Sequence, residues 1–452
     1  MKILLAGGGT VGETLVEQLS AEGYDLTVID PDSSKLEQLV EHYDVMAVQG
    51  NCASMETLRQ AGADKADLMI VATGSDEVNL LCTMTVHGLN PKIHTIARIR
   101  DPEYVEQAYS MRNVFGLSLA FNPEKQAAIE IERLLKYPGF LKRDSFAKGR
   151  VEIVELRIDA DSKLCNVSLS MLNSIVKCKV LVCAVLRDGV AITPGGHFTL
   201  QAGDKIFVTA PTNTLSLLLK NLGIVTHKVR RVIIAGGGTI AYYLAEALMD
   251  DHIRVTMIEK DKKRCKKLAE LLPRANIICG DAGSQPLLTS EGLSDCDALI
   301  TLTGMDELNV IVSMYGSSCE VAQIVTKLDH VGDAKIIDNL PVGSIICPRK
   351  LCCNNIVRYV RAMQNQAGAA ITIHTIAGGQ AEAMEFIVDE TTLHCGEPLK
   401  ALKLKKNILI VCITRNGRIE IPNGDSCFYE GDSVIVVDNR SDLILQLNDI
   451  FE

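Results

Sequence analysis

The beginning of the chain alternates short runs of Val, Ile and Leu with longer amphipathic segments. The apolar runs are ILLA, DLTVID, VMAVQ, LMIVAT and HTIARI, each short enough for a buried strand. Between them, residues 11–20 and 33–42 carry apolar side chains at helical spacing, and Asp32 or Ser33 is available to cap the second segment. Strands that alternate with helices in this way predict a parallel sheet with helices on both faces.

The same pattern occurs a second time. The segment GGGTVGETLVEQL at 7–19 returns as GGGTIAYYLAEAL at 236–248, and TGSDEVNLL at 73–81 returns as TGMDELNVI at 303–311. Self-similarity at a fixed spacing indicates a repeated structural unit. We therefore predict a tandem duplication in which each unit takes up about half of the chain.

Each unit continues into a second part with a different pattern. VEIVELRI, from residue 151, alternates apolar and polar positions, whereas KVLVCAVLR, from residue 179, is a buried run. The dipeptides at 188–189 (Asp-Gly) and 416–417 (Asn-Gly) are typical of tight hairpin turns. These features predict a small α+β domain. Because a core of this size is marginal alone, we expect the domain to pack against a partner copy.

The predicted fold class is α/β, with two Rossmann-like doubly wound parallel sheets, each followed by a small α+β domain. The expected limits are 1–140 and 227–370 for the Rossmann-like domains, and 141–226 and 371–452 for the small domains. A further helix is predicted from Pro123 onward, at the end of the first Rossmann-like domain. Its apolar face packs either on its own domain or in another subunit, and this face includes Ala127, Ile131 and Leu134.

Composition argues against several classes of protein. A formal net charge of −10 disfavours a nucleic acid partner, which needs clustered Lys and Arg over a broad face. The 15 cysteines are scattered without a CxxC pair, which indicates buried free thiols in a reducing cytosol rather than disulfides or a zinc site. The apolar run at the N-terminus is too short for a signal peptide, and no run approaches the ~20 residues that span a bilayer. We therefore expect no direct membrane insertion.

The glycine-rich turn after the first apolar run is a candidate dinucleotide site. Gly7, Gly9 and Gly12 follow a predicted strand and open a predicted helix, where backbone N–H groups and the helix dipole favour a pyrophosphate. Asp30 ends the next predicted strand, where a carboxylate accepts hydrogen bonds from both ribose hydroxyls. Such a carboxylate favours NAD, or another nucleotide with an unphosphorylated ribose, over NADP. The alternative is a turn that only lets the helix pack closely on the strand.

The second copy of this turn has changed in several places. It has Gly236, Gly238 and Ala241, with Glu259 in the acidic position, and these residues are still compatible with a dinucleotide. The alternative is a copy that kept the fold and relaxed its ligand. Six basic residues follow within 260–267, either as a solvated helix face or as a contact for phosphate or an acidic partner.

Further polar residues repeat at the predicted strand ends, where ligands of open α/β sheets collect. Asn51 and Asp281 are placed to face an adenine edge, and Arg98 and Lys327 are candidates for phosphate or charge-sensing contacts. The repeated DExN sequence starts the following helix and supplies either ligand contacts or helix caps. The full set of candidate nucleotide-binding residues is Gly7, Gly8, Gly9, Thr10, Val11, Gly12, Asp30, Asn51, Cys52, Thr73, Gly74, Asn79, Arg98, Gly236, Gly238, Thr239, Ile240, Glu259, Asp281, Thr303 and Lys327.

Residues for catalysis are not found in the sequence. An NAD-dependent oxidoreductase, the main alternative function, needs a His, Lys or Tyr acid/base beside a substrate pocket. The second part of each unit is too small for a catalytic domain, and its one notable histidine, His197, has no counterpart in the second copy. A redox-sensing transcriptional regulator would need a helix-turn-helix, for which no segment remains. We predict no catalytic residues, no metal ligands, and a sensor rather than an enzyme.

The repeated order of the two kinds of domain, together with GGGTVG, Asp30, ATGSDEVN and IARIRDP, resembles the TrkA family, the regulatory subunits of bacterial and archaeal Trk potassium uptake systems. The small domains resemble the C-terminal half of the RCK (regulator of potassium conductance) module. The resemblance spans essentially the whole chain.

The resemblance implies binding of NAD(H), and in related regulators of ATP or ADP, at the first part of each unit. It also implies a homotetrameric ring in the cytoplasm, peripheral on the inner face of the cell membrane, under a TrkH- or TrkG-like potassium-translocating subunit. Nucleotides that prefer one ring conformation would then gate potassium uptake. Ala241, Glu259 and Lys327 depart from the first copy, which leaves open whether both sites take the same ligand.

Overall fold

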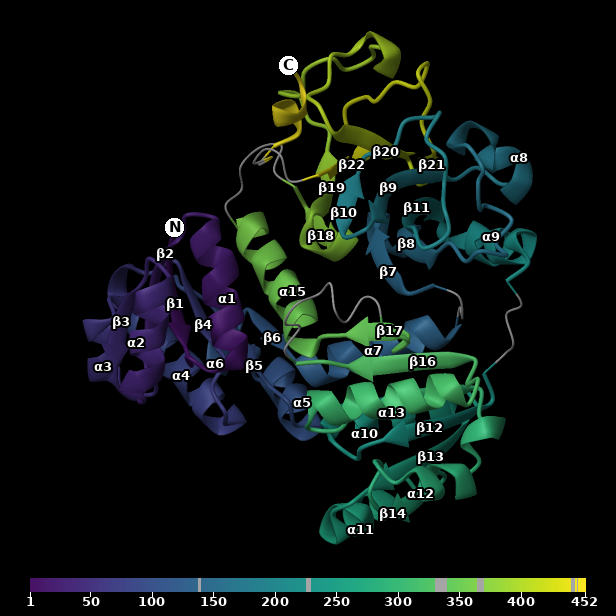
Figure 1. Ribbon diagram of the computed structural model, residues 1–452. Coiled ribbons are helices and arrows are strands. Elements are labelled where there is room, and N and C mark those ends of the chain that lie inside the picture. Colours follow the sequence, from purple (N-terminus) through teal and green to yellow (C-terminus); the bar gives the residue numbers. More distant parts are fainter. Residues whose placement is uncertain (137–139, 225–228, 330–339, 364–369, 440–443, 445) are drawn as a thin grey trace. The chain divides into compact units, whose positions relative to one another are not determined.

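The chain is described by a computed structural model that covers residues 1–136, 140–224, 229–329, 340–363, 370–439, 444 and 446–452 (Figure 1). It divides into two compact units. Met1–Ala128 and Cys347–Tyr359 form the first unit, and Ile129–Ile346 and Val360–Glu452 form the second. The expected domain limit between residues 226 and 227 lies outside the described residues.

The first unit is built on a six-stranded parallel sheet with the order β3-β2-β1-β4-β5-β6, which is the Rossmann order. Helix α2 begins where predicted, because the Asp32 carboxylate accepts a hydrogen bond from the Ser34 amide at 3.0 Å. The elements are β1 (Lys2–Ala6), α1 (Thr10–Ala21), β2 (Asp25–Asp30), α2 (Ser33–His42), β3 (Met46–Gln49), α3 (Met55–Gln60), β4 (Leu68–Val71), α4 (Asp76–Leu89), β5 (His94–Arg98), α5 (Pro102–Ser110), α6 (Arg112–Phe115), β6 (Leu119–Phe121) and the start of α7 (Pro123–Lys136).

The second unit contains the corresponding sheet, with the order β14-β13-β12-β15-β16-β17 and all strands parallel. The duplication predicted from the sequence is thus present strand for strand. Its elements are β12 (Arg231–Ala235), α10 (Thr239–Asp250), β13 (Arg254–Glu259), α11 (Lys262–Leu271), β14 (Asn276–Cys279), α12 (Gln285–Ser290), β15 (Ala298–Thr301), α13 (Asp306–Ser318), β16 (Gln323–Lys327), β17 (Ser344–Ile346) and α15 (Pro348–Met363), whose first part belongs to the first unit.

Each small domain is a five-stranded antiparallel sheet with short helices. The first has the order β10-β9-β11-β8-β7 and the second β18-β19-β22-β20-β21. Both expected hairpins are confirmed, since Asp188 and Gly189, like Asn416 and Gly417, adopt the positive φ angles that such turns need. The elements are β7 (Lys142–Phe146), β8 (Val151–Arg157), α8 (Leu172–Val176), β9 (Leu181–Arg187), β10 (Val190–Ile192), β11 (Lys205–Pro211), α9 (Leu215–Leu222), β18 (Thr372–Ile376), β19 (Ala381–Ile387), β20 (Ile408–Arg415), β21 (Arg418–Glu420) and β22 (Ser433–Asp438).

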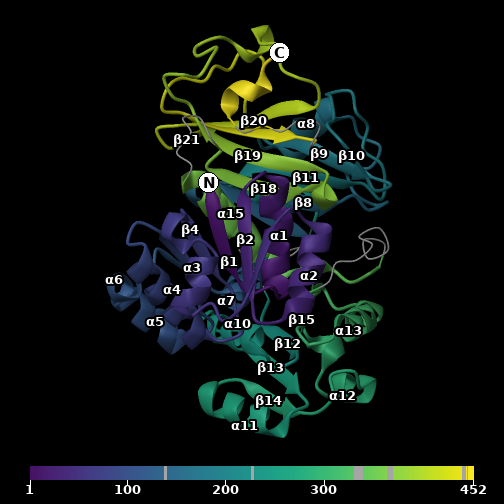
Figure 2. The same cartoon turned by 90° about the vertical axis from the view of Figure 1, so that its left-hand side faces the viewer.

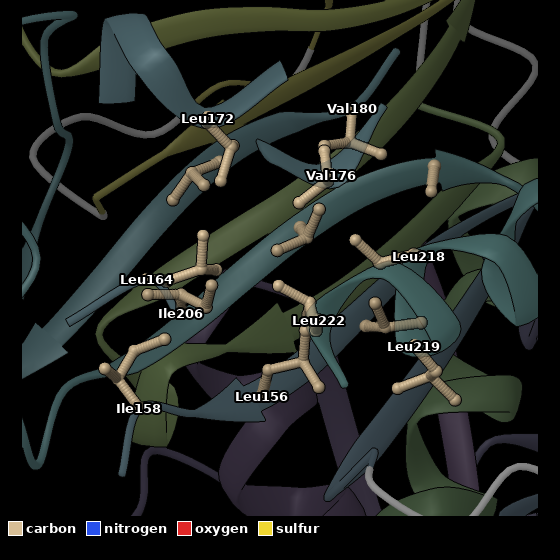
Figure 3. Packing of buried hydrophobic residues seen from close by; sticks show 14 of the residues in the cluster. Leu156, Ile158, Leu164, Leu172, Val176, Val180, Ile206, Leu218, Leu219 and Leu222 are labelled. Atoms are coloured by element: carbon tan, nitrogen blue, oxygen red, sulfur yellow. The ribbon is translucent and has the colours of Figure 1, made fainter. Parts of the chain in front are cut away.

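The two small domains share a core, as expected for domains of this size. One face of the first sheet, with Cys183 and Phe207, packs against Val411 and Val437 of the second sheet (Figure 2). The opposite face of the first sheet is covered by α8 and α9. Their leucine and valine side chains form one hydrophobic cluster with side chains of the sheet such as Leu156 and Ile206 (Figure 3). Each sheet is therefore buried on the face that meets the other copy, and this burial drives their association.

Helices α7 and α15 connect the two copies in a reciprocal way. In the second unit, the Gln323 side-chain amide donates to the Leu134 carbonyl of α7 at 2.8 Å. In the first unit, Gln18 of α1 donates to Asn354 of α15 at 3.1 Å, and the Cys353 thiol points to the Val11 carbonyl. The apolar residues predicted for α7, Ala127, Ile131 and Leu134, are thus buried, and the Leu134 carbonyl is bound by the second Rossmann-like sheet.

Candidate nucleotide sites

The first glycine turn is tightly packed at Gly7 and Gly12 and open at Gly9. Gly7 has a φ of +101°, and a Cβ there would lie 2.7 Å from the Ala72 carbonyl oxygen. A Cβ on Gly12 would collide with the Gly7 carbonyl oxygen, so this glycine lets α1 pack closely on the turn. Gly9 has no neighbour within 4 Å of such a Cβ, which leaves open space at the N-terminus of α1.

Asp30 joins the end of β2 to this turn. Its carboxylate is 6% exposed and accepts hydrogen bonds from the Gly8 amide at 2.7 Å and from the Asp32 amide at 2.9 Å. These two bonds fix the side chain beside the glycine turn. A carboxylate in this place still has acceptor capacity for hydroxyl groups, because each oxygen can accept more than one hydrogen bond.

The second copy reproduces this arrangement with a longer acid. Gly236 has a φ of +107°, and Glu259 accepts from the Gly237 amide and from the Asp261 amide, both at 2.7 Å. Ala241 stands where the first copy has glycine and is fully buried. Arg264 of α11 adds a contact that we did not predict, since its Nε donates to the Gly237 carbonyl oxygen at 2.7 Å.

The basic run that contains Arg264 is otherwise a solvated surface. All five lysines of the run are exposed, namely Lys260, Lys262, Lys263, Lys266 and Lys267. Only Arg264 turns toward the glycine turn. The basic run was the only feature of the sequence that pointed to Arg264. Periodicity does not distinguish one arginine that faces the turn from lysines that face the solvent.

Asn79 of the DExN sequence connects two strand ends. Its side-chain oxygen accepts from the Thr73 amide at 3.0 Å and from the Thr73 hydroxyl at 2.6 Å, while Nδ2 donates to the Arg98 carbonyl at 2.8 Å. Asn309 makes the same contacts with Thr303 and Lys327. Both amides are fully buried. Asn79 and Asn309 therefore hold the ends of the fourth and fifth strands of each sheet in position.

The two basic residues at the fifth strand ends have different partners. Arg98 Nη2 lies 2.6 Å from Glu124 Oε1, an ion pair that sequence reasoning missed. Within the described residues, Arg98 Nε is buried and has no hydrogen-bond partner. Lys327 Nζ instead lies 2.6 Å from Asp329 Oδ2 and 3.2 Å from the Thr303 carbonyl oxygen. The two sites thus differ in charge arrangement at this edge.

The remaining candidates differ in accessibility. Those with exposed atoms at the carboxyl ends of the strands are Thr10, Asn51, Gly74, Gly238, Thr239 and Asp281. Asn51 and Asp281 each accept a hydrogen bond from the amide two residues ahead, which holds their side chains in a turn. The candidates that point into the core are Val11, Cys52 and Ile240.

The other sequence expectations concern cysteines, metals and the membrane. All 15 cysteines are free, and only Cys279 and Cys395 are exposed. Among the described residues, no three His, Cys, Asp or Glu side chains are arranged to hold a metal ion. None of the described helices combines the length and the apolar run that crossing a bilayer requires.

Comparison with known proteins gives family matches in both halves. The model of the TrkA-N domain matches residues 3–120 and 232–348, and that of the TrkA-C domain matches residues 153–223 and 383–451. A Trk system potassium uptake protein TrkA homolog from Archaeoglobus fulgidus is 31% identical over 451 residues, covering 100% of both chains. The Trk system potassium uptake protein TrkA of Haemophilus influenzae is 29% identical over 460 residues, covering 100% of this chain and 99% of its own.

Two solved structures share the fold at 16% identity. The GsuK RCK domain has a TM-score of 0.62 and covers 97% of this chain and 92% of its own. The GsuK channel bound to NAD has a TM-score of 0.60 and covers 97% of this chain and 77% of its own.

Proposed function

This chain belongs to the TrkA family of potassium uptake proteins, and from that membership we propose that it is a nucleotide-sensing regulatory subunit that gates a membrane potassium transporter. The ligand we propose is NAD(H), with ATP or ADP as competitors for the same turns. In this proposal the chain is a regulator and not an enzyme, which agrees with relatives that are named potassium uptake proteins.

One observation carries the proposal. In both copies the carboxylate at the end of the second strand is held 2.7 Å from the amide of the glycine turn, by Asp30 in the first copy and Glu259 in the second. Two sites that have diverged in sequence have kept this contact. This contact supports the proposal, because dinucleotides need a carboxylate that can accept from ribose hydroxyls next to a helix N-terminus suited to phosphates.

The remaining candidate residues have separate roles in this proposal. The amides of the glycine turns contact the pyrophosphate, and Asn51 and Asp281 face the base. Thr73 and Thr303 lie beside the phosphates, held in place by Asn79 and Asn309. The full set is the one predicted from the sequence, with Arg264 added at the second site.

The gating mechanism is a shift between two conformations. A nucleotide that binds one conformation of the assembly more tightly than the other shifts the population by its difference in affinity. We propose a homotetrameric ring, peripheral on the cytoplasmic face of the membrane, bound to a TrkH- or TrkG-like subunit. We further propose that the four domains have the limits 1–140, 141–226, 227–370 and 371–452. The GsuK channel, which has this fold, was solved with NAD bound.

Calorimetric titration of the full chain with NAD+, NADH, ADP and ATP tests the binding step. We expect two nucleotides per chain, and one each for Asp30→Ala and Glu259→Ala. Absence of binding by all four nucleotides would contradict the proposal, and so would oxidation of a substrate at the nicotinamide ring, which is the oxidoreductase alternative. The gating step is tested by potassium flux in vesicles that hold the co-purified transporter, where nucleotide must change the flux.

A further inference from the structure

The second Rossmann sheet carries two thiols beside its candidate nucleotide site. Cys265 on α11 is buried, and its Sγ lies 3.2 Å from the Glu259 carbonyl oxygen, to which it donates. Cys279, the last residue of β14, is paired with Glu259 in the register of β13 and β14. The two side chains also interact, since Cys279 is one of the groups that raise the pKa of Cys265. Glu259 therefore has one thiol against its carbonyl and the other on the neighbouring strand.

A second thiol pair in the chain serves as a comparison. Cys52 and Cys82 of the first unit also lie in one cluster and shift each other's pKa, but both are buried in the core of the first sheet. Cys279 is exposed, so only the pair formed with Cys265 has a sulfur that a dissolved oxidant can reach. The positions that correspond to this pair in the first copy are occupied by Leu36 and Gln49. The accessible thiol pair thus belongs to the second nucleotide site alone.

We propose that Cys265 and Cys279 form a reversible disulfide in the presence of peroxide, and that this disulfide weakens nucleotide binding at the second site. The second half of this statement rests on the proposed nucleotide-binding function of Glu259 and its glycine turn.

The chemistry balances with hydrogen peroxide as the oxidant. The exposed Cys279 sulfur attacks one peroxide oxygen, an S–O bond forms, the O–O bond breaks, and water leaves with the thiol proton. The Cys265 sulfur then attacks the sulfenic sulfur, the S–S bond forms, and a second water leaves. Two thiols have lost two electrons, and the peroxide has gained them. Burial, together with the neighbouring Cys279, raises the pKa of Cys265 to about 11 and disfavours its thiolate. Cys279 is the exposed thiol of the pair and therefore meets the peroxide first.

The disulfide would act on the site through α11. A disulfide holds its sulfurs at about 2.05 Å, closer than the sulfurs of two free thiols can come, so α11 and the end of β14 must approach each other. The Cys265 thiol then no longer donates to the Glu259 carbonyl. Arg264, the residue before Cys265, holds the Gly237 carbonyl at 2.7 Å and moves with the helix. Both contacts that shape the second turn are thereby disturbed.

The disulfide is tested on the reduced full chain by titration with hydrogen peroxide, alkylation of the remaining thiols and peptide mass spectrometry. We expect a linked peptide joining Cys265 and Cys279 at peroxide levels that leave Cys52 and Cys82 unlinked. The variant Cys279→Ser must lose the linked peptide while its unfolding temperature stays unchanged, since the side chain is exposed. The exposed Cys395 reports that the peroxide has reacted with the protein. If Cys265 and Cys279 can still be alkylated once Cys395 has been oxidised, the proposal is overturned.

Nucleotide titration tests the regulatory half on the Asp30→Ala background, which isolates the second site. We expect oxidation to weaken NAD+ binding about tenfold, as for the loss of one hydrogen bond to a charged group, and dithiothreitol to restore it. Added Cys279→Ser must abolish this sensitivity. An unchanged affinity in the linked protein overturns the regulation. If the reduced protein binds no nucleotide at all, the proposed function fails, while the peptide map still reports the disulfide independently.

Discussion

The Asp144 carboxylate lies 3.1 Å from Nδ1 of His374, and this pair joins β7 of the first small domain to β18 of the second. The His374 ring packs edge-on against Phe146 at 4.9 Å between centroids. Its Nε2 lies 3.2 Å from the Ser145 carbonyl oxygen. Lys142 Nζ also approaches Asp144, at 3.0 Å. A nearly buried carboxylate is thus shared by two basic groups at the junction of the two sheets.

This cluster predicts a loss of stability in acid. Burial alone would raise the pKa of Asp144, but the Lys142 ammonium and His374 outweigh it and lower the pKa to about 2. Because the pKa of Asp144 is lower in the folded chain than in the unfolded chain, the ionised carboxylate stabilises the fold fully at pH values above about 4. This stabilisation is lost as the pH falls from about 4 to about 2. We expect Asp144→Asn to lose about 2 kcal/mol of unfolding free energy at pH 7, measured by urea denaturation. The difference from the natural chain must shrink below pH 4; a constant difference would contradict this explanation.

Gly7 is predicted to stabilise the fold, whereas Gly9 is predicted to serve nucleotide binding. Gly7→Ala introduces a Cβ 2.7 Å from a carbonyl oxygen at a φ of +101°, and we expect it to cost about 2 kcal/mol. Gly9→Ala meets no atom within 4 Å and should leave the unfolding temperature unchanged. It should instead weaken nucleotide binding, because the methyl group stands where the phosphates approach. Thermal unfolding and calorimetry of the two variants separate these effects, and equal behaviour of the pair would refute the assignment.

The buried amide of Asn79 is predicted to stabilise the fold. Its side chain ties the Thr73 amide to the Arg98 carbonyl, and Asn79→Ala leaves both backbone groups without their partner. We expect a loss of about 2 kcal/mol, measured by chemical denaturation. The exposed Asn51→Ala is the matched control and should change stability by less than about 0.5 kcal/mol. A similar loss in both variants would argue against the structural role.

The ion pair between Arg143 and Glu152 gives a prediction by double substitution. The two side chains are buried and joined by bonds of 2.6 Å and 2.7 Å, and the second copy has Ile373 in place of the arginine. Arg143→Met leaves the buried Glu152 carboxylate with Arg133 at 3.7 Å in place of the two short bonds, and should cost about 3 kcal/mol of unfolding free energy. The double variant with Glu152→Met should recover most of this loss, because the poorly compensated charge is gone. Additive losses would show that the pair stabilises more than it costs to desolvate.

The sequence predicted the parallel sheets because strands that alternate with helices are joined by right-handed crossovers, and periodicity located most strands. The strand order came from the structure. It did not predict β6 or β17, because runs of three residues carry too little periodicity. The sequence also did not predict the reciprocal packing of α7 and α15. Ala127, Ile131 and Leu134 form the same apolar stripe whichever copy they contact, so the stripe does not identify its partner.

At the candidate sites the sequence located the backbone features and missed part of the charge network. The glycine turns and their acids are local patterns, and Asp30 is close enough in sequence to be recognised from the fingerprint. Glu124 pairs with Arg98 from a helix 26 residues away, a contact that only the fold brings together. Asn79 was found as a candidate, but its burial and its partners required the three-dimensional structure.

Fusion of the two copies permits a chemistry that separate copies could not have. Asp144 and His374 occupy the same position of the corresponding strands β7 and β18, one opposite Ile153 and the other opposite Ala383. In a symmetric pair of separate identical chains, each residue at this position would meet itself, so an acid would face an acid. Covalent linkage makes the two positions independently mutable, and an acid can then meet a base. The same release from symmetry allows the two nucleotide sites to evolve different ligands and different controls.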